Sequence, residues 1–192
     1  CLQPLPPTDI QPMTVLVLYA RDQLACPQKL LTHDEDILAA LAEQGIGLQR
    51  VAPVAPVAPV EQGDWLAVGQ QMLREQLPDS DYSAGELRSY EGLPAYAEAT
   101  SQSIEPACQY ARPLGWLLLR GAGTLFLQRG TQVLAVCCEA GSLLELPADT
   151  PLSFVPRVGQ GCLLLCLAST PDDLRGQPLT ADPFAGLEPL DL

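Results

Sequence analysis

The second half of the chain consists of short apolar runs separated by turn residues. The runs follow one another at a spacing of about ten residues, which is typical of an antiparallel β-sandwich or small barrel. Glycine or proline stands in each gap between them. The six predicted strands cover residues 114–119, 124–128, 132–138, 142–146, 152–155 and 162–168. This pattern predicts a mostly β fold.

The first half mixes strand and helix signals. Residues 14–19 are apolar and partly β-branched, which predicts a buried strand. Thr32 and Glu35 have the spacing of a capping box and precede apolar residues at helical spacing, so we expect a helix over 33–44. A strand over 46–51 follows. We expect the N-terminal helices to pack outside the β structure.

A proline-rich stretch, PVAPVAPV, covers residues 53–60. Proline at every third position matches one turn of polyproline II. The stretch is either a ligand for a proline-binding module or a short stiff linker, and the lack of basic residues beside it favours the linker. We then expect a helix over 62–77 and a loop-rich segment over 78–106 with a short helix near 92–99.

The composition restricts the class of protein. The 192 residues are 47% hydrophobic, which suits one globular domain. With a net charge of −13 and a single lysine, Lys29, we expect neither nucleic acid nor an anionic membrane as a partner. No apolar run approaches the ~18 residues of a membrane span. The seven cysteines are odd in number, which is typical of buried thiols in the cytoplasm; the alternative is a mature lipoprotein beginning at Cys1.

A connected series of motifs runs through residues 118–154. Its members are Gly121, Gly123, Leu125, Leu127, Val133, Val136, Cys138, Glu139, Gly141, Leu143, Leu144, Pro147, Ala148 and Thr150. The series resembles the barrel of acireductone dioxygenase, a family of the cupin superfamily, and the opening segment from residue 14 to 50 is also similar to that family.

The resemblance implies a fold and a domain organisation. It implies a cupin-type antiparallel β-barrel, or jelly roll, with a few peripheral N-terminal helices. The single cupin domain would cover residues 13–170, between an N-terminal tail or extension at 1–12 and a C-terminal tail at 171–192.

The same resemblance implies positions for a metal site. Catalytic members bind Fe(II) or Ni(II) through three histidines and one glutamate. These ligands fall at Cys108, Tyr110, Leu114 and Leu152 of this sequence, and Trp116 takes the place of a strand arginine. Divalent first-row metals need imidazole or carboxylate donors, and of the four residues only the cysteine is a plausible ligand. We therefore expect no metal cofactor and no catalytic residue, but a pocket at these positions lined by Trp116.

The other reactive side chains have structural interpretations. His33 lies beside the predicted helix cap and is interpreted as a solvated surface residue. Cys162 and Cys166 share one face of a predicted strand, and Cys137 and Cys138 lie on another. They form a thiolate metal site, a redox pair or part of the apolar core, and the frequent burial of free cysteine favours the core.

Two functions of different classes fit the sequence. The first is a non-catalytic cupin, a pseudoenzyme that acts through an unknown protein partner, a homodimer or a small apolar ligand. The second is an oxidoreductase: an acireductone-type dioxygenase of methionine salvage with unrecognised metal ligands, or a cupin with metal-free chemistry. The replaced ligand quartet favours the first.

Two segments are candidates for association. A homodimer would form through a sheet face or the 53–60 segment, and the acidic tail at 171–192 would become ordered only by contact with a partner. The alternative is a monomer with solvated tails.

Overall fold

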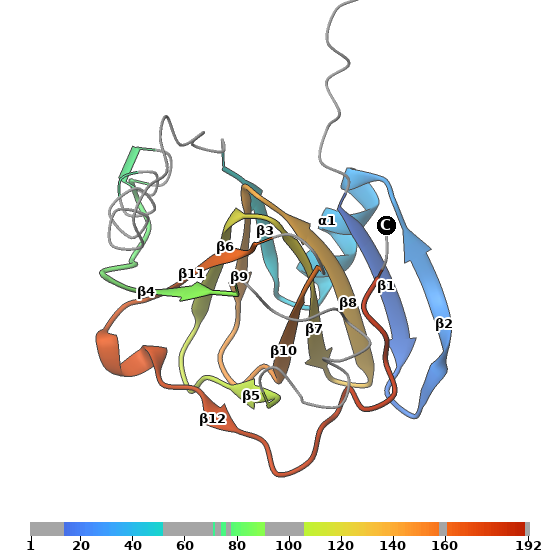
Figure 1. Ribbon diagram of the computed structural model, residues 1–192. Coiled ribbons are helices and arrows are strands. Elements are labelled where there is room, and N and C mark those ends of the chain that lie inside the picture. The colour runs from blue at the N-terminus through green and yellow to red at the C-terminus, as the bar shows by residue number, and fades with distance from the viewer. Residues whose placement is uncertain are drawn as a thin grey trace, which may run out of the picture.

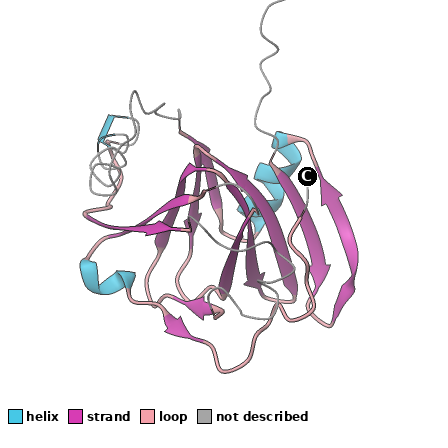
Figure 2. Cartoon of the chain, in the orientation of Figure 1, coloured by secondary structure: helices cyan, strands magenta, loops and turns pink. Residues whose placement is uncertain are grey.

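Two antiparallel sheets pack face to face in the computed structural model, and the helix α1 (Asp34–Glu43) lies at one side of them (Figures 1 and 2). The structure describes residues 14–51, 71, 74–75, 78–90, 106–157 and 161–190. The architecture is mostly β, as the apolar runs predict.

The strands divide into a seven-stranded and a five-stranded sheet. The first has the order β12 (Gln177–Pro178), β5 (Cys108–Gln109), β10 (Leu152–Pro156), β7 (Ala122–Arg129), β8 (Gln132–Glu139), β1 (Val15–Ala20) and β2 (Gln23–Leu31). The second has the order β3 (Gly47–Arg50), β9 (Ser142–Leu146), β6 (Leu114–Arg120), β11 (Leu163–Ala168) and β4 (Ala84–Ser89). The strands predicted at 14–19 and 46–51 and the six predicted in the second half are all confirmed.

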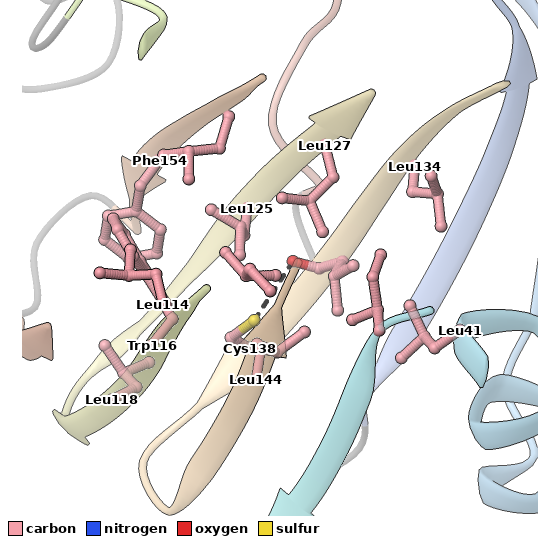
Figure 3. Close-up of a cluster of buried hydrophobic side chains, with 14 of the residues drawn as sticks. Leu41, Leu114, Trp116, Leu118, Leu125, Leu127, Leu134, Cys138, Leu144 and Phe154 are labelled. Carbon is pink, nitrogen blue, oxygen red and sulfur yellow. Dashed lines mark hydrogen bonds between the residues drawn. The ribbon is translucent and has the colours of Figure 1, made fainter. Parts of the chain in front are cut away.

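Successive side chains of each strand point to opposite faces of its sheet, and those on the inner faces fill the space between the two sheets. On β6, for example, Trp116 and Leu118 face the interior, whereas Leu117 and Leu119 belong to a separate cluster on the other face. The interior cluster is the main core, and Figure 3 shows its side chains converging from both sheets and from α1. Its largest fully buried members include Trp116, Phe154, Leu41, Leu114, Leu118, Leu125, Leu127 and Leu134.

The G-x-G motif joins β6 to β7 and needs both glycines. Gly121 has φ +84°, and a β-carbon there would lie 2.5 Å from the carbonyl oxygen of Gly161. A β-carbon on Gly123 would lie 2.5 Å from the Phe154 ring. The motif therefore permits a sharp corner, at which the chain passes from the five-stranded to the seven-stranded sheet, and close packing of β7 against β10.

The helix α1 begins one residue later than a capping box at Thr32 requires. His33 is the N-cap residue, its backbone is extended, and no side chain caps the helix, so the predicted capping box is wrong. The helix also contributes to the main core, because Ile37 and Leu41 are fully buried in it. The helix therefore packs against the outside of the sandwich at one side, as expected, and adds two of its side chains to the core.

Two longer strands were not predicted. β2 is an edge strand whose side chains are mostly exposed, and it contains Pro27, so it lacks the alternation that identifies a half-buried strand. β4 lies in the segment that we expected to be loop-rich, because Glu86 and Arg88 interrupt its apolar pattern. Its side chains nevertheless alternate, with Leu87 on the outer face and Tyr90, just beyond the strand, in the interior.

Several sequence predictions lie outside the described residues. These are the N-terminal tail, the proline-rich stretch at 53–60, the short helix near 92–99 and most of the helix at 62–77. Of that last helix, residues 71 and 74–75 are described and are helical, and Gln71 donates a hydrogen bond to Glu75. Within the described part of the chain, no helix is long and apolar enough to cross a membrane.

The C-terminal segment packs on the body of the protein. After the short helix η1 (Pro171–Leu174), β12 pairs with β5. Phe184 is buried and stacks on Phe126 at 5.9 Å, on the outer face of the seven-stranded sheet. The backbone N–H of Leu190 donates to the Thr124 hydroxyl. This corrects the expectation that the tail is ordered only by a partner, since its apolar residues cover the chain's own sheet.

Candidate functional site

The five residues that the sequence singled out meet at one side of the interior. Cys108 lies on β5 and pairs with Leu152, the first residue of β10. Tyr110 directly follows β5, and β6 supplies Leu114 and Trp116. Four of the five belong to the main core, and Cys108 packs against it. We call this side of the sandwich, where β4 faces β5 and β10, the mouth.

The side chains at three of the family's ligand positions are buried. Leu114 is 2% exposed, and Tyr110 and Leu152 are each 3% exposed. In Figure 3, Leu114 and Trp116 lie beside Phe154 at one end of the row of buried side chains. The positions that the family resemblance assigns to metal ligands therefore lie within an apolar and aromatic core.

The side chains at these positions do not fit the Fe(II) or Ni(II) that the family resemblance implies. Leu114 and Leu152 carry no donor atom. Burial raises the pKa of the Tyr110 hydroxyl well above its ordinary value, so this phenol is protonated at neutral pH. Cys108 is left as the one plausible ligand of the four. Within the described residues, no group of three or more His, Cys, Asp or Glu side chains is arranged to hold a metal ion.

Arg88 of β4 is a member of the mouth that sequence reasoning missed. Its Nη2 donates a 2.8 Å hydrogen bond to the Tyr110 hydroxyl oxygen and lies 3.1 Å from a carboxylate oxygen of Glu86. Its guanidinium carbon is 6.0 Å from the ring centroid of Trp116, within cation–π range. The Arg88 side chain is 19% exposed. It joins the five-stranded sheet to the loop after β5 in the other sheet.

Aromatic rings line the inner part of the mouth. Phe154 makes an edge contact with Trp116 at 5.8 Å and a tilted contact with Tyr90 at 5.5 Å. Trp116 is 1% exposed, and its indole Nε1 has no hydrogen-bond partner in the described part of the chain. Buried N–H groups are normally paired, so this donor stands out from the rest of the core.

The C-terminal segment covers the mouth from outside. A β-carbon at Gly176 would lie 3.2 Å from Cζ of Tyr110 and 3.4 Å from Sγ of Cys108. Leu174 packs on the main core, and β12 pairs with β5 beside it. The chain itself therefore occupies the approach to Cys108 and Tyr110.

The other reactive residues lie where their structural interpretations place them. Cys137, Cys138, Cys162 and Cys166 are all buried. Burial raises the pKa of the Cys138 thiol and raises that of Cys162 to about 12, which disfavours reactive thiolates. His33 is exposed at the start of α1.

Comparison with known proteins identifies the family. No family model matches the chain. Acireductone dioxygenase from Stutzerimonas stutzeri is 30% identical over 141 residues, which cover 72% of this chain and 77% of the relative. The chain belongs to the acireductone dioxygenase family. Acireductone dioxygenase 1 from Pectobacterium atrosepticum is 28% identical over 139 residues, with 72% and 80% coverage.

A solved structure supports the acireductone dioxygenase fold independently. The acireductone dioxygenase from Bacillus anthracis, solved with a cadmium ion in its active centre, superimposes with a TM-score of 0.64. The match covers 86% of this chain and 98% of that chain at 12% identity. The predicted cupin fold is therefore confirmed, as two antiparallel sheets around one core.

The sequence identified most of the mouth but not Arg88. The family resemblance assigned Cys108, Tyr110, Leu114, Trp116 and Leu152 to one site, and the structure brings these five residues together. The sequence signal for β4 is the placement of polar or amphipathic residues at every second position, at Glu86, Arg88 and Tyr90. Such a pattern indicates a strand only if these polar side chains face the interior, and we interpreted it as a loop.

Proposed function

We propose that this protein is a member of the acireductone dioxygenase family that acts by binding rather than by catalysis, as a non-catalytic cupin. The observation that carries the proposal is the burial of Tyr110, Leu114 and Leu152 in the main core, at exposures of 2–3%. A catalytic metal site needs donors that converge on an ion with room for substrate beside it. These side chains supply neither imidazole nor carboxylate.

The Arg88 hydrogen bond to Tyr110 supports the same interpretation. A metal ion holds its ligands together, and the loss of such an ion leaves a fold in need of another link at that place. Here the bond between Arg88 and Tyr110 joins the two sheets across the mouth. The fold is thus stabilised at this point by its own side chains.

The second candidate is a dioxygenase with different ligands. It is favoured by the names of the relatives, which are acireductone dioxygenases at 28–30% identity. It would require metal donors other than the four residues at the family positions, in a molecule whose single histidine, His33, lies exposed at the start of α1.

Turnover separates the two candidates. The protein and the Pectobacterium atrosepticum relative would be incubated separately with Fe(II) or Ni(II), and the consumption of acireductone and oxygen would be followed. We expect turnover by the relative and only the uncatalysed rate for this protein. Metal-dependent turnover by this protein would establish the dioxygenase alternative and overturn the non-catalytic function.

A further inference from the structure

We propose that the mouth binds a small molecule carrying a carboxylate, which accepts hydrogen bonds from Trp116 and Arg88. The inference rests on the proposed function, because it names the ligand class of a mouth that no longer serves a metal. Three features carry it: a buried donor with no partner among the described residues, a guanidinium over the same indole ring, and further aromatic rings beside that indole.

The unsatisfied donor is the indole N–H of Trp116. At 1% exposure it is removed from bulk water, and no acceptor reaches it within the described residues. Leaving a buried donor unpaired costs about 1–3 kcal/mol, so an acceptor placed there stabilises the folded protein. An N–H group cannot accept a hydrogen bond, which restricts the complementary group to an oxygen or another acceptor.

The guanidinium of Arg88 sets the charge of that acceptor. It lies 6.0 Å from the Trp116 ring centroid and is largely enclosed, with a side chain that is 19% exposed. Its present partners include the Tyr110 hydroxyl and the Glu86 carboxylate. The planar fork of arginine matches carboxylates in particular, and Glu86 shows that this guanidinium can be approached by one.

The surrounding rings favour an apolar body on the same ligand. Trp116 and Tyr90 both contact Phe154, so the cation lies at the edge of an aromatic cluster. A flat apolar group attached to a carboxylate combines both requirements, and benzoate is the simplest probe of that kind. Its neutral counterpart, benzyl alcohol, keeps the ring and an oxygen but lacks the charge.

In this proposal the ligand enters from the β4 edge of the sheet. β4 is the last strand of the five-stranded sheet, and Glu86 on it is 51% exposed. An incoming carboxylate would exchange with the side chain of Glu86 at the guanidinium, and no strand pairing would need to break. Glu86 and the ligand therefore compete for Arg88.

The experiment uses the fluorescence of Trp116 in the full chain. The protein has two tryptophans, so Trp65→Phe leaves Trp116 as the one emitter. In that background we expect a saturable change with benzoate at millimolar concentration and none with benzyl alcohol. Arg88→Met should weaken benzoate binding by about tenfold or more, as for a hydrogen bond to a charged group. Arg21→Met, which removes a charge at the β1–β2 turn, should leave the binding unchanged.

A second variant should raise the affinity for benzoate and leaves the hydrogen bond between Arg88 and Tyr110 in place. Glu86→Gln removes the competing carboxylate, and we expect benzoate to bind several-fold more tightly to it. Three results would each overturn the proposal: no saturable fluorescence change with benzoate, equal binding of benzyl alcohol, or an unchanged benzoate affinity in Glu86→Gln. The first result is expected if an ordered water molecule accepts the Trp116 hydrogen bond instead. None of these outcomes bears on turnover, so the proposed function is tested separately.

Discussion

The two sides of the interior are built in different ways. Around α1, the core consists of aliphatic side chains such as Leu41 and Leu134, which are fully buried and make no demand for hydrogen bonds. At the mouth, the same cluster contains the Tyr110 hydroxyl, the Trp116 indole and the edge of the Arg88 guanidinium. Figure 3 shows the aliphatic side at Leu41 and Leu134 and the aromatic side at Trp116 and Phe154.

Polar groups inside the fold are concentrated at the mouth. The side chains buried on the aliphatic side contribute through packing, and their contribution to stability follows from the apolar area that they bury. The mouth contains a cation, a phenol and an N–H with no partner in the described part of the chain, at the place where the family resemblance puts a metal. Substitutions should therefore affect the aliphatic side through cavity formation and the mouth through hydrogen bonding and charge.

The largest effect is expected when family-like ligands are returned to the mouth. Leu114→His with Leu152→His removes two buried leucines and leaves two imidazoles poorly paired, and each buried polar group costs about 1–3 kcal/mol in addition to lost packing. We expect a loss of about 4 kcal/mol in the free energy of unfolding, measured by denaturant titration in chelator. Leu30→His with Leu38→His, at exposed positions, is the matched control and should change little. An equally stable double variant would show that the mouth is open and hydrated.

A cavity on the aliphatic side should have the next largest effect. Leu134 is fully buried, and Leu134→Ala should cost about 3 kcal/mol, as for other leucine-to-alanine changes in cores. Thermal unfolding would measure it, with Leu30→Ala as the exposed control. A cost below about 1 kcal/mol would mean that this side of the core is loosely packed and does not differ from the mouth in the way proposed.

Removing the link across the mouth should cost less. Arg88→Met breaks the hydrogen bond to Tyr110 and the ion pair with Glu86, and hydrogen bonds to charged groups contribute about 1.5–3 kcal/mol. We expect a loss of about 2 kcal/mol, partly recovered in Arg88→Lys. Arg175→Met breaks a pair between fully exposed side chains and should stay within about 0.5 kcal/mol of the parent. If the two arginine variants proved equivalent, Arg88 would have no structural role in the mouth.

The smallest effect at neutral pH is expected for Tyr110→Phe, at about 1 kcal/mol for one hydrogen bond. Its clearer signature is at high pH. The folded pKa of Tyr110 is raised above its unfolded value near 10, so its contribution is complete below pH 10 and is lost as pH rises above that value. Stability should therefore fall less steeply above pH 10 in Tyr110→Phe than in the parent.

Tyr82 provides the comparison for that experiment, because burial and the neighbouring Glu145 also raise its pKa. Tyr82→Phe should flatten the alkaline profile in the same direction. A Tyr110→Phe profile that matched the parent would show that the mouth is accessible to water, in contrast to its buried appearance.

The sequence predicted the features that depend on apolar alternation. Leu125, Leu127, Leu134 and Leu144 lie in runs whose apolar character identifies strands, and those strands and the family fold were predicted correctly. β2 could not be identified, because an exposed edge strand has no buried face to mark it in the sequence. The C-terminal segment has no period at all, and the burial of Phe184 depends on a sheet that is distant in sequence.

The mouth was only partly predictable for a related reason. Spacing within the family motif located Tyr110 and Leu152, but the partner of Tyr110 comes from a strand of another sheet. From the sequence alone, Arg88 is expected to be a surface residue. Its side chain is largely buried only because β4 pairs with β11. Polar residues inside a fold are the ones that local patterns identify least well.

Metal content is the most direct test of the central claim, that the mouth is held by side chains and not by a metal. The protein would be equilibrated with Fe(II) and in parallel with Ni(II), separated from free metal, and analysed for metal bound per chain. We expect well below one equivalent of either metal, with no change in Tyr110→Phe or Cys108→Ala. About one equivalent per chain, lost in either variant, would contradict the account.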